Sequence, residues 1–286
     1  MATPLIKPIC QGSALLKDVQ HRSEQTDRFH LWWLGQSGFL LGWKQHFLLF
    51  DPYLSDSLTK KYAATDKPHV RMTEQVVLPE ALDFVQVVTS SHQHTDHLDG
   101  ETLRPLVKAN PSIQMVVPHA HLELASQRVG KPASWFHSMD AGSNLQIDPF
   151  RLHALPSAHE CIERDEQGRH LFLGYVVEFG PWRVYHSGDT LVYDGLADQL
   201  KQWAIDAAIL PINGRGPERR VAGNMWGDEA ARLASEAGVG CVIPCHYEMF
   251  AFNTQSPAQF ITTCQQLGQG HAVLRAGGCW SSPMQH

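Results

Sequence analysis

The sequence predicts an α+β fold in which two mainly β sheets are stacked and helices lie on their outer faces. Two observations predict this arrangement. Short apolar segments broken by glycines dominate the first part of the chain, as in antiparallel hairpins, whereas strand and helix patterns alternate in the later part. The 286 residues are also enough to bury one sizeable core. We therefore expect a single domain over residues 28–286, preceded by a polar N-terminal arm over residues 1–27.

Strands open the expected domain. Residues 30–43 and 46–53 are rich in aromatic and bulky apolar side chains and are interrupted by three glycines. Residues 54–80 are polar and are expected to be irregular. The next elements are expected in this order: a buried strand at 84–89, a helix at 101–109, a strand at 112–117, a helix at 121–130, and strands at 135–138 and 145–156.

A hairpin and further alternation of strand and helix complete the domain. A Gly-Pro pair joins the apolar runs at 171–179 and 182–188. Asp228 is placed to cap a helix that Gly238 ends. The remaining elements are expected as a strand at 204–212, a helix at 227–238, a strand at 240–245 and a helix at 256–268.

Composition limits the classes of function. The net charge of −6, from 23 Lys and Arg against 29 Asp and Glu, provides no general basic field for a nucleic acid, so a small-molecule substrate is expected. No apolar run reaches the length of a membrane-spanning helix, and no secretion leader is recognised. Six cysteines without a CxxC pair indicate reduced thiols. We therefore expect a cytoplasmic protein with neither a nucleic acid nor a membrane as partner.

The segment "SSHQHTDH", which follows the buried strand at 84–89, predicts a metal site. It places His92, His94, Asp96 and His97 within six positions. Imidazole and carboxylate are ligands of zinc, manganese and iron, and a loop of this spacing can direct some of them at one ion and the rest at a second. A His-rich surface loop is the simpler explanation for a single histidine, but four ligand-type residues at one strand end favour a dinuclear site.

Other strand ends supply the remaining candidates. His159, Asp189 and His246 each lie where an apolar run gives way to a loop. Asp189 can bridge two cations, and the two histidines can complete one ion each. His186 precedes Asp189 by three positions and is a candidate ligand or catalytic acid, but we favour a side chain that orients Asp189.

The motif residues resemble those of the metallo-β-lactamase fold hydrolases, whose His-x-His-x-Asp-His signature is complete in "HQHTDH". The acidic residue of "LLFDPY", Asp51, matches the first acidic motif of that family. The resemblance implies a four-layer αββα sandwich and two divalent metal ions, with zinc or manganese favoured over iron, and a supporting role for Asp51 behind the ligands. It implies one ion held by His92, His94 and His159, a second held by Asp96, His97 and His246, and Asp189 bridging both.

Within that family, "WWLGQSGFLL", "YHSGDT", "LPING" and "VIPCHYEMF" resemble the branch that contains L-ascorbate-6-phosphate lactonase. This narrower resemblance implies a hydrolase in which a metal-bridging hydroxide attacks a small ester, such as the lactone of a phosphorylated sugar acid. Asp96 would then be catalytic, because it both binds an ion and orients the water. Three alternatives stay open: a phosphodiesterase acting on a small nucleotide or phospholipid, a di-iron redox protein, and a metal-binding module without catalysis.

A Gly-rich segment at 211–226 is expected to form a lid over an anionic substrate. It holds Arg215, Arg219 and Arg220, whose planar guanidinium groups suit phosphate or carboxylate. The alternative is a solvated loop whose Glu218 pairs with these arginines. Further pocket candidates are the neighbours of the motif residues: Tyr53, Tyr193, Asn213, Asn224, Trp226 and Tyr247. A homo-oligomer is left open, with the adjacent Trp32 and Trp33 and the N-terminal arm as candidate contacts.

Overall fold

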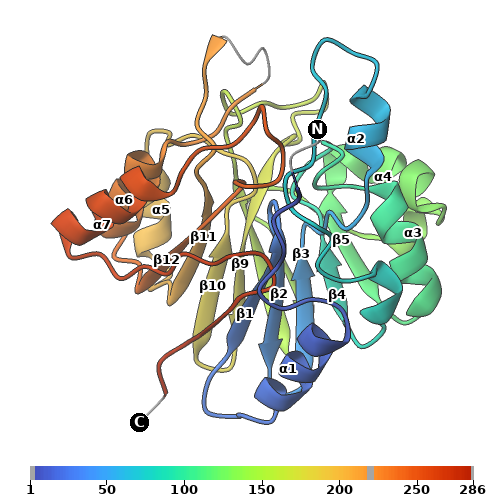
Figure 1. Ribbon diagram of the computed structural model, residues 1–286, viewed down its shortest axis with the longest axis horizontal. Coiled ribbons are helices and arrows are strands. Elements are labelled where there is room, and N and C mark those ends of the chain that lie inside the picture. Colours follow the sequence, from blue (N-terminus) through green and yellow to red (C-terminus); the bar gives the residue numbers. More distant parts are fainter. Residues whose placement is uncertain (1–3, 218–221, 285–286) are drawn as a thin grey trace.

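The computed structural model describes residues 4–217 and 222–284 as two β sheets packed face to face between helices. A seven-stranded sheet has the order β13-β1-β2-β3-β4-β5-β6, and a six-stranded sheet has the order β12-β11-β10-β9-β8-β7. Figure 1 shows helices α3 and α4 outside the first sheet and helices α5, α6 and α7 outside the second. The predicted four-layer αββα sandwich is therefore confirmed.

The seven-stranded sheet mixes antiparallel and parallel pairing. Strands β1, β2 and β3 form an antiparallel meander, with β13 added antiparallel to β1, whereas β3, β4, β5 and β6 are parallel. The parallel pairs are joined through helices on one face, as such connections require. The bounds are β1 (His30–Gly35), β2 (Gly38–Trp43), β3 (His46–Phe50), β4 (Val87–Thr89), β5 (Gln114–Pro118), β6 (His137–Met139) and β13 (Cys279–Ser281).

The six-stranded sheet begins antiparallel and ends parallel. The expected hairpin at Gly180 and Pro181 is confirmed, with Phe179 opposite Trp182 in the register of β9 and β10. Strands β10, β11 and β12 are parallel. The bounds are β7 (Asn144–Ile147), β8 (Phe150–Pro156), β9 (Leu173–Phe179), β10 (Trp182–His186), β11 (Ala207–Pro211) and β12 (Cys241–Cys245).

The helices of the described residues are short. None of them has the length and apolar character that crossing a lipid bilayer requires. The α helices are α1 (Ser13–Ser23), α2 (Ser57–Tyr62), α3 (Gly100–Ala109), α4 (Leu122–Val129), α5 (Leu196–Lys201), α6 (Gly227–Glu236) and α7 (Ala258–Leu267). Single 3-10 turns are η1 (Pro79–Ala81), η2 (His119–His121) and η3 (Ala133–Trp135).

Two apolar clusters hold the layers together. Alternate side chains of a strand point to opposite faces, so Leu31 and Trp33 pack between the two sheets, whereas Trp32 and Leu34 pack on the other face of the first sheet. Both indoles are at most 1% exposed. The tryptophan pair, a candidate subunit contact, therefore lies inside the chain, which covers both sides of the strand.

The N-terminal arm contains a helix that packs on the domain. Leu15 and Val19 of α1 are buried in the cluster on the outer face of the first sheet. Asp18 of the same helix accepts a hydrogen bond from Trp32 Nε1 at 2.8 Å. Residues 54–80 were also expected to be irregular, but they contain α2 and the first two residues of η1.

The N-terminal helix cap predicted at Asp228 is instead provided by the next residue, Glu229. Helix α6 begins at Gly227, and the Glu229 carboxylate accepts a hydrogen bond from the Trp226 backbone N–H at 2.8 Å. A carboxylate at the third helical position can reach back to the residue that precedes the helix, whereas one at the second position cannot do so as readily.

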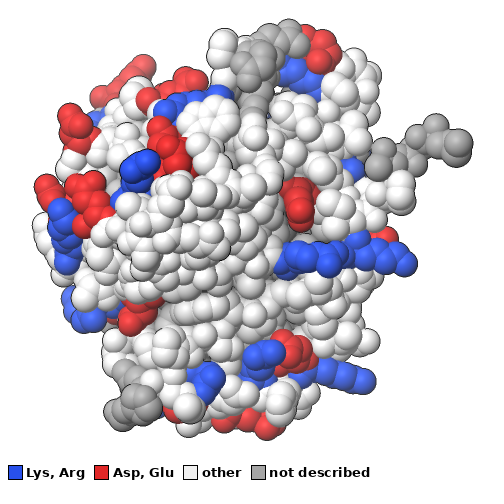
Figure 2. Space-filling view, turned by 60° about the vertical axis from the view of Figure 1, so that its left-hand side comes forward, with Lys and Arg blue, Asp and Glu red and all other residues white. Residues whose placement is uncertain are grey.

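Charges of both signs are interspersed on the surface. On the face shown in Figure 2, acidic and basic side chains lie around the margin of a broad uncharged area. Among the described residues visible there, Lys and Arg form short groups rather than one continuous basic surface. This distribution agrees with the small negative net charge of the sequence.

Candidate metal centre

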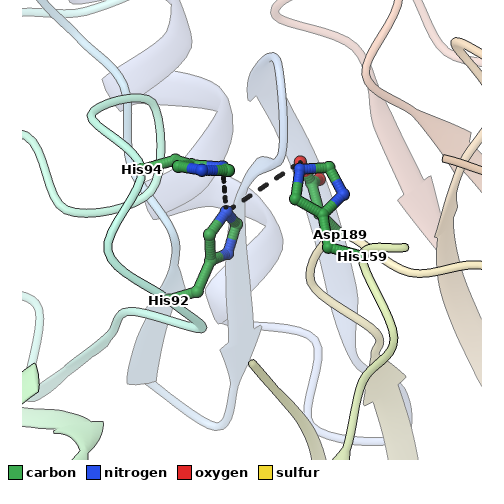
Figure 3. A group of neighbouring side chains, drawn as sticks. All are labelled: His92, His94, His159 and Asp189. Atoms are coloured by element: carbon green, nitrogen blue, oxygen red, sulfur yellow. Dashed lines mark hydrogen bonds and ion pairs between the residues drawn. The ribbon is translucent and has the colours of Figure 1, made fainter. Parts of the chain in front are cut away.

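The predicted ligands converge at one edge of the sandwich from the ends of four strands. The cluster from His92 to His97 follows β4 of the first sheet. Strands β8, β10 and β12 of the second sheet run in the same direction, and their trailing loops hold His159, Asp189 and His246. Figure 3 shows His92 and His94 facing Asp189 and His159 across the interface between the two sheets.

One group of ligand-type atoms is formed by His92, His94, His159 and Asp189, which place four such atoms within 4.8 Å of one another. His92 Nε2 lies 2.9 Å from His94 Nδ1 and 4.0 Å from Asp189 Oδ2. His159 Nε2 lies 3.7 Å from the same Asp189 oxygen. This is the set that the resemblance assigned to the first ion.

A second group is formed by Asp96, His97 and His246. His246 Nε2 lies 3.4 Å from Asp96 Oδ2 and 3.4 Å from Asp189 Oδ2. His97 Nε2 lies 3.3 Å from Asp189 Oδ1. Asp189 thus directs its carboxylate at both groups, which is the arrangement a bridging ligand requires.

The donor chemistry of this centre fits divalent cations. All seven candidate ligands offer nitrogen or oxygen, as zinc, manganese and iron accept. Within the described residues, His97 Nε2 and Asp189 Oδ1 are buried without a hydrogen-bond partner. Buried polar atoms are rarely left unpaired, and a cation would satisfy both.

The histidines of the first group are held neutral. Burial, followed by the neighbouring imidazoles, lowers the pKa of His92 well below its usual range. Burial is also the main cause that lowers the pKa of His94 to about 4. A neutral imidazole has a free lone pair, so these two side chains need lose no proton to bind a metal ion.

The carboxylates of the second group favour the charged form of its histidines. Burial opposes the charge, but the Asp189 and Asp96 carboxylates raise the pKa of His246 to about 9 and that of His97 well above its usual range. Conversely, His246 and His97 overcome the effect of burial and hold the pKa of Asp189 low. A divalent cation would displace the proton of His246, so affinity is expected to rise with pH at least until the pH reaches the pKa of His246, about 9.

Asp51 forms hydrogen bonds with a candidate ligand and with the loop that carries it. One of its oxygens accepts a hydrogen bond from His97 Nδ1 at 2.7 Å, and the carboxylate also accepts from the Ser91 backbone N–H at 3.0 Å and from the Ser91 hydroxyl. An imidazole whose Nδ1 donates in this way presents Nε2 to a metal ion. The orienting role predicted for Asp51 stays a prediction, and this geometry is the one it needs.

His186 lies behind the turn that presents Asp189. Its Nε2 donates to the Ser37 backbone oxygen at 2.8 Å, and its Nδ1 accepts from Gly188 N–H at 3.3 Å. Gly188 has φ +59°, and a Cβ there would lie 2.6 Å from Ser91 Cβ, so glycine is required for this close approach. Both ring nitrogens of His186 are therefore engaged by backbone, as an orienting side chain requires.

Gln36 is a site residue that the sequence did not reveal. Its amide Nε2 donates to Asp96 Oδ2 at 2.8 Å and lies 3.0 Å from His246 Nε2. Glutamine is uncommon among metal ligands, and this one lies in the turn between β1 and β2, some 60 residues before Asp96. Gln36 lies within the segment "WWLGQSGFLL" of the narrower resemblance, but that resemblance assigned it no role.

A cavity of about 380 Å³ opens over the ligand groups. Aromatic rings line one wall: Tyr62 and His69 are stacked with ring centroids 4.2 Å apart, and Phe252 lies edge-on to His69 at 4.5 Å. Three cationic residues also line the cavity: Lys61, Lys67 and Arg128. The sequence did not predict that α2 and the residues near 250 would form this wall.

The arginine segment is only partly described. Arg219 and Arg220 lie outside the described residues, as does Glu218. Arg215 lines a second cavity of about 510 Å³ beside His159. Its guanidinium binds both Glu229 oxygens, at 2.6 and 2.7 Å, so within the described chain it is held by α6.

The other predicted pocket residues have structural partners. Asn213 pairs with Asn224 and Asn253 through its amide, at 3.0 and 2.9 Å. Tyr193 donates to the Pro156 backbone oxygen at 2.8 Å. Tyr247 is buried against Trp33 and donates to the Leu274 backbone oxygen. Their roles in substrate binding stay predictions, and these contacts give the two tyrosines a function in packing.

Comparison with known proteins identifies a family model and relatives that match this chain. The sequence profile described as Beta-lactamase superfamily domain matches residues 46–247, well over half of the chain. A protein of Alkaliphilus metalliredigens described as a UPF0173 metal-dependent hydrolase is 29% identical over 240 residues, which cover 80% of this chain and 89% of the relative.

Two solved structures share the fold. Igni18, a metallo hydrolase from Ignicoccus hospitalis, is 17% identical with a TM-score of 0.65, over 90% of this chain and 100% of its own. CmlA, a diiron β-hydroxylase from Streptomyces venezuelae, is 14% identical with a TM-score of 0.66, over 89% of this chain and 54% of its own. At these identities the likeness extends to the fold alone.

Proposed function

We propose that this chain cleaves a small anionic ester, such as the lactone of a phosphorylated sugar acid. The chain belongs to the β-lactamase superfamily and is a metal-dependent hydrolase of the metallo-β-lactamase fold. The observation on which the proposal rests is the shared position of Asp189. Its carboxylate faces both ligand groups, so two cations held there would lie side by side.

The protein's own residues hold and orient the reacting groups. When bound, divalent cations would lower the pKa of a water molecule towards about 7 and so supply a nucleophile at neutral pH. Asp96 is 15% exposed whereas Asp189 is 4% exposed, so Asp96 has the better access to the cavity. We assign to Asp96 the orientation of the attacking water, in addition to metal binding.

The cavity supports a substrate that is small, partly apolar and anionic. Its volume of about 380 Å³ suits a single small molecule. The stacked rings of Tyr62 and His69 offer a flat apolar surface, and Lys61 lies on the same wall. Lys67 and Arg128 also line this cavity, and cationic side chains at its wall favour a ligand with a negative group.

A turnover screen on metal-analysed protein tests the proposal. The purified protein would be analysed for its metals and then assayed on sugar lactones with and without a phosphate group, and on bis-aryl phosphates. We expect about two divalent ions per chain and faster turnover of phosphorylated lactones than of neutral ones. Turnover of the bis-aryl phosphates alone would favour a phosphodiesterase and would overturn the ester assignment.

A further inference from the structure

Gln36 lies in an unusual backbone conformation beside the second ligand group. Its φ is +51°, in the left-handed region that favours glycine, and His246 has φ +65°. The two residues also bind each other, since the backbone N–H of His246 donates to the Gln36 backbone oxygen at 3.1 Å. Trp33 Nε1 donates to the same oxygen at 2.9 Å. The surrounding structure thus fixes Gln36 and His246 as a unit.

The side chain of Gln36 is directed into the metal centre. Gln36 is 1% exposed, and its Nε2 lies 2.8 Å from Asp96 Oδ2 and 3.0 Å from His246 Nε2. Its Oε1 is buried and has no hydrogen-bond partner within the described residues. In this orientation the amide leaves one of its two polar ends without a hydrogen bond.

The spacing of these atoms matches that of neighbouring ligands around one cation. With metal–ligand bonds of about 2.1 Å, adjacent ligand atoms lie about 3.0 Å apart in an octahedral shell and about 3.4 Å apart in a tetrahedral one. The amide end of Gln36 therefore stands where a further ligand of the Asp96–His246 ion would stand. The two ends of an amide exchange places by rotation about the last side-chain bond, and a cation would favour the oxygen.

We propose that Gln36 is an additional ligand of the second cation and supplies its amide oxygen. The second ion then has five protein ligands, whereas the first has four: the second set is Gln36, Asp96, His97, His246 and the shared Asp189. A larger coordination number and an extra neutral oxygen favour manganese over zinc. This inference rests on the same metal centre as the proposed function, but not on its substrate.

Metal titration of two Gln36 variants distinguishes whether Gln36 binds the cation or only donates a hydrogen bond to Asp96. Metal-free protein would be titrated with Mn²⁺ by calorimetry. If Gln36 is a ligand, Gln36→Ala lowers the affinity for the second Mn²⁺ by about tenfold or more, whereas Gln36→Glu keeps or raises it, because a carboxylate of the same length replaces the amide oxygen. If Gln36 only donates to Asp96, both variants lose affinity, since Glu would repel Asp96, and the proposal is overturned. Unchanged affinity in both would overturn it equally.

A second glutamine provides the matched control. Gln45 has φ +63°, like Gln36, but it is exposed in the turn between β2 and β3. Gln45→Ala likewise places alanine at a position with positive φ, but this position does not contact the metal centre. Its Mn²⁺ titration should therefore equal that of the unaltered chain. Gln36→Gly relieves the left-handed conformation and serves if Gln36→Ala folds poorly. Because the readout is metal affinity, absence of ester turnover would count against the proposed function alone.

Discussion

The cavity over the metal centre has a floor and a rim that are built in different ways. The floor consists of the seven candidate ligands, which come from strand ends and are held by further buried contacts such as that of Asp51 with His97. The rim consists of α2, His69 and the residues near 250, and its one short helix exposes Lys61 to solvent. The floor is fixed by the two sheets, whereas the rim depends on a six-residue helix and on contacts between aromatic rings.

This contrast in construction indicates which part of the function each region can determine. Rigid strand ends hold ligand atoms in place, as the activation of water by metal ions requires. A peripheral helix can change without disturbing the sheets, so it can select among substrates while the chemistry is retained. Substitutions on the floor should therefore abolish turnover of every ester, and substitutions on the rim should change the preference between esters.

The largest effect is expected for Asp189→Ala. Because this carboxylate faces both ligand groups, its loss should disrupt both cations, whose combined stabilisation of the transition state amounts to several kcal/mol. We expect turnover to fall by about 1000-fold or more, since each 1.4 kcal/mol is a factor of about ten. The measurement is kcat on the best ester of the screen, together with metal content.

Asp194 is the control for that substitution. It is exposed and lies five positions further along the same loop, so Asp194→Ala should leave kcat unchanged. Circular dichroism of both variants should match that of the unaltered chain. If Asp189→Ala retained normal turnover and both metal ions, the bridging role would be wrong and the floor would not form one dinuclear unit.

A smaller effect, on metal affinity, is expected for Asp51→Asn, because Asp51 contacts the candidate ligand His97 but does not belong to the ligand set. The amide keeps the size of the carboxylate but removes the charge that accepts from His97 Nδ1 and from Ser91. Loss of such an orienting partner weakens metal binding by about 10- to 100-fold. Competition with a chelator measures this, with Asp83→Asn on the exposed surface as the control. Equal affinity in the two variants would show that Asp51 does not support the ligands of the floor.

The sequence predicted most of the floor because its signal is local. Four candidate ligands lie within six positions of one loop, and each of the others follows an apolar strand. Strand ends can be recognised from composition, and residue types that bind metals are few. Gln36 was missed for the opposite reasons: its residue type is common, it lies in a turn, and only the assembled sheet, with β2, β3 and β4 side by side, brings that turn to the loop of Asp96.

The rim could not be predicted because its signals are weak. Helix α2 has only six residues and buries only Leu58, so its polar sequence shows no periodicity from which a helix can be recognised. Similarly, α1 is anchored by Leu15 and Val19, two apolar positions in an otherwise polar arm. The aromatic wall joins α2 to Phe252 across almost 200 residues, and a contact of that range depends on the complete fold.

The smallest expected effect concerns the charge of the rim and compares two adjacent lysines of α2. Lys61 lines the cavity with its ammonium group 5.1 Å from the Tyr62 ring, whereas Lys60 points to α3 and pairs with Glu101 at 2.8 Å. Because Lys61 is exposed, water screens its attraction for a substrate anion. We expect Lys61→Ala to raise KM for a phosphorylated lactone by about threefold to tenfold with little change in kcat.

The paired substitution Lys60→Ala removes the same charge from the same helix but outside the cavity, so it distinguishes a local contact from the net charge of the protein. Its KM should stay within about twofold of the unaltered value. The effect of Lys61→Ala should also shrink in high salt and vanish for a neutral lactone, because it is electrostatic. If both lysine variants raised KM equally, or if the neutral lactone responded as strongly as the phosphorylated one, α2 would not select the substrate charge. The difference between floor and rim would then be one of rigidity alone.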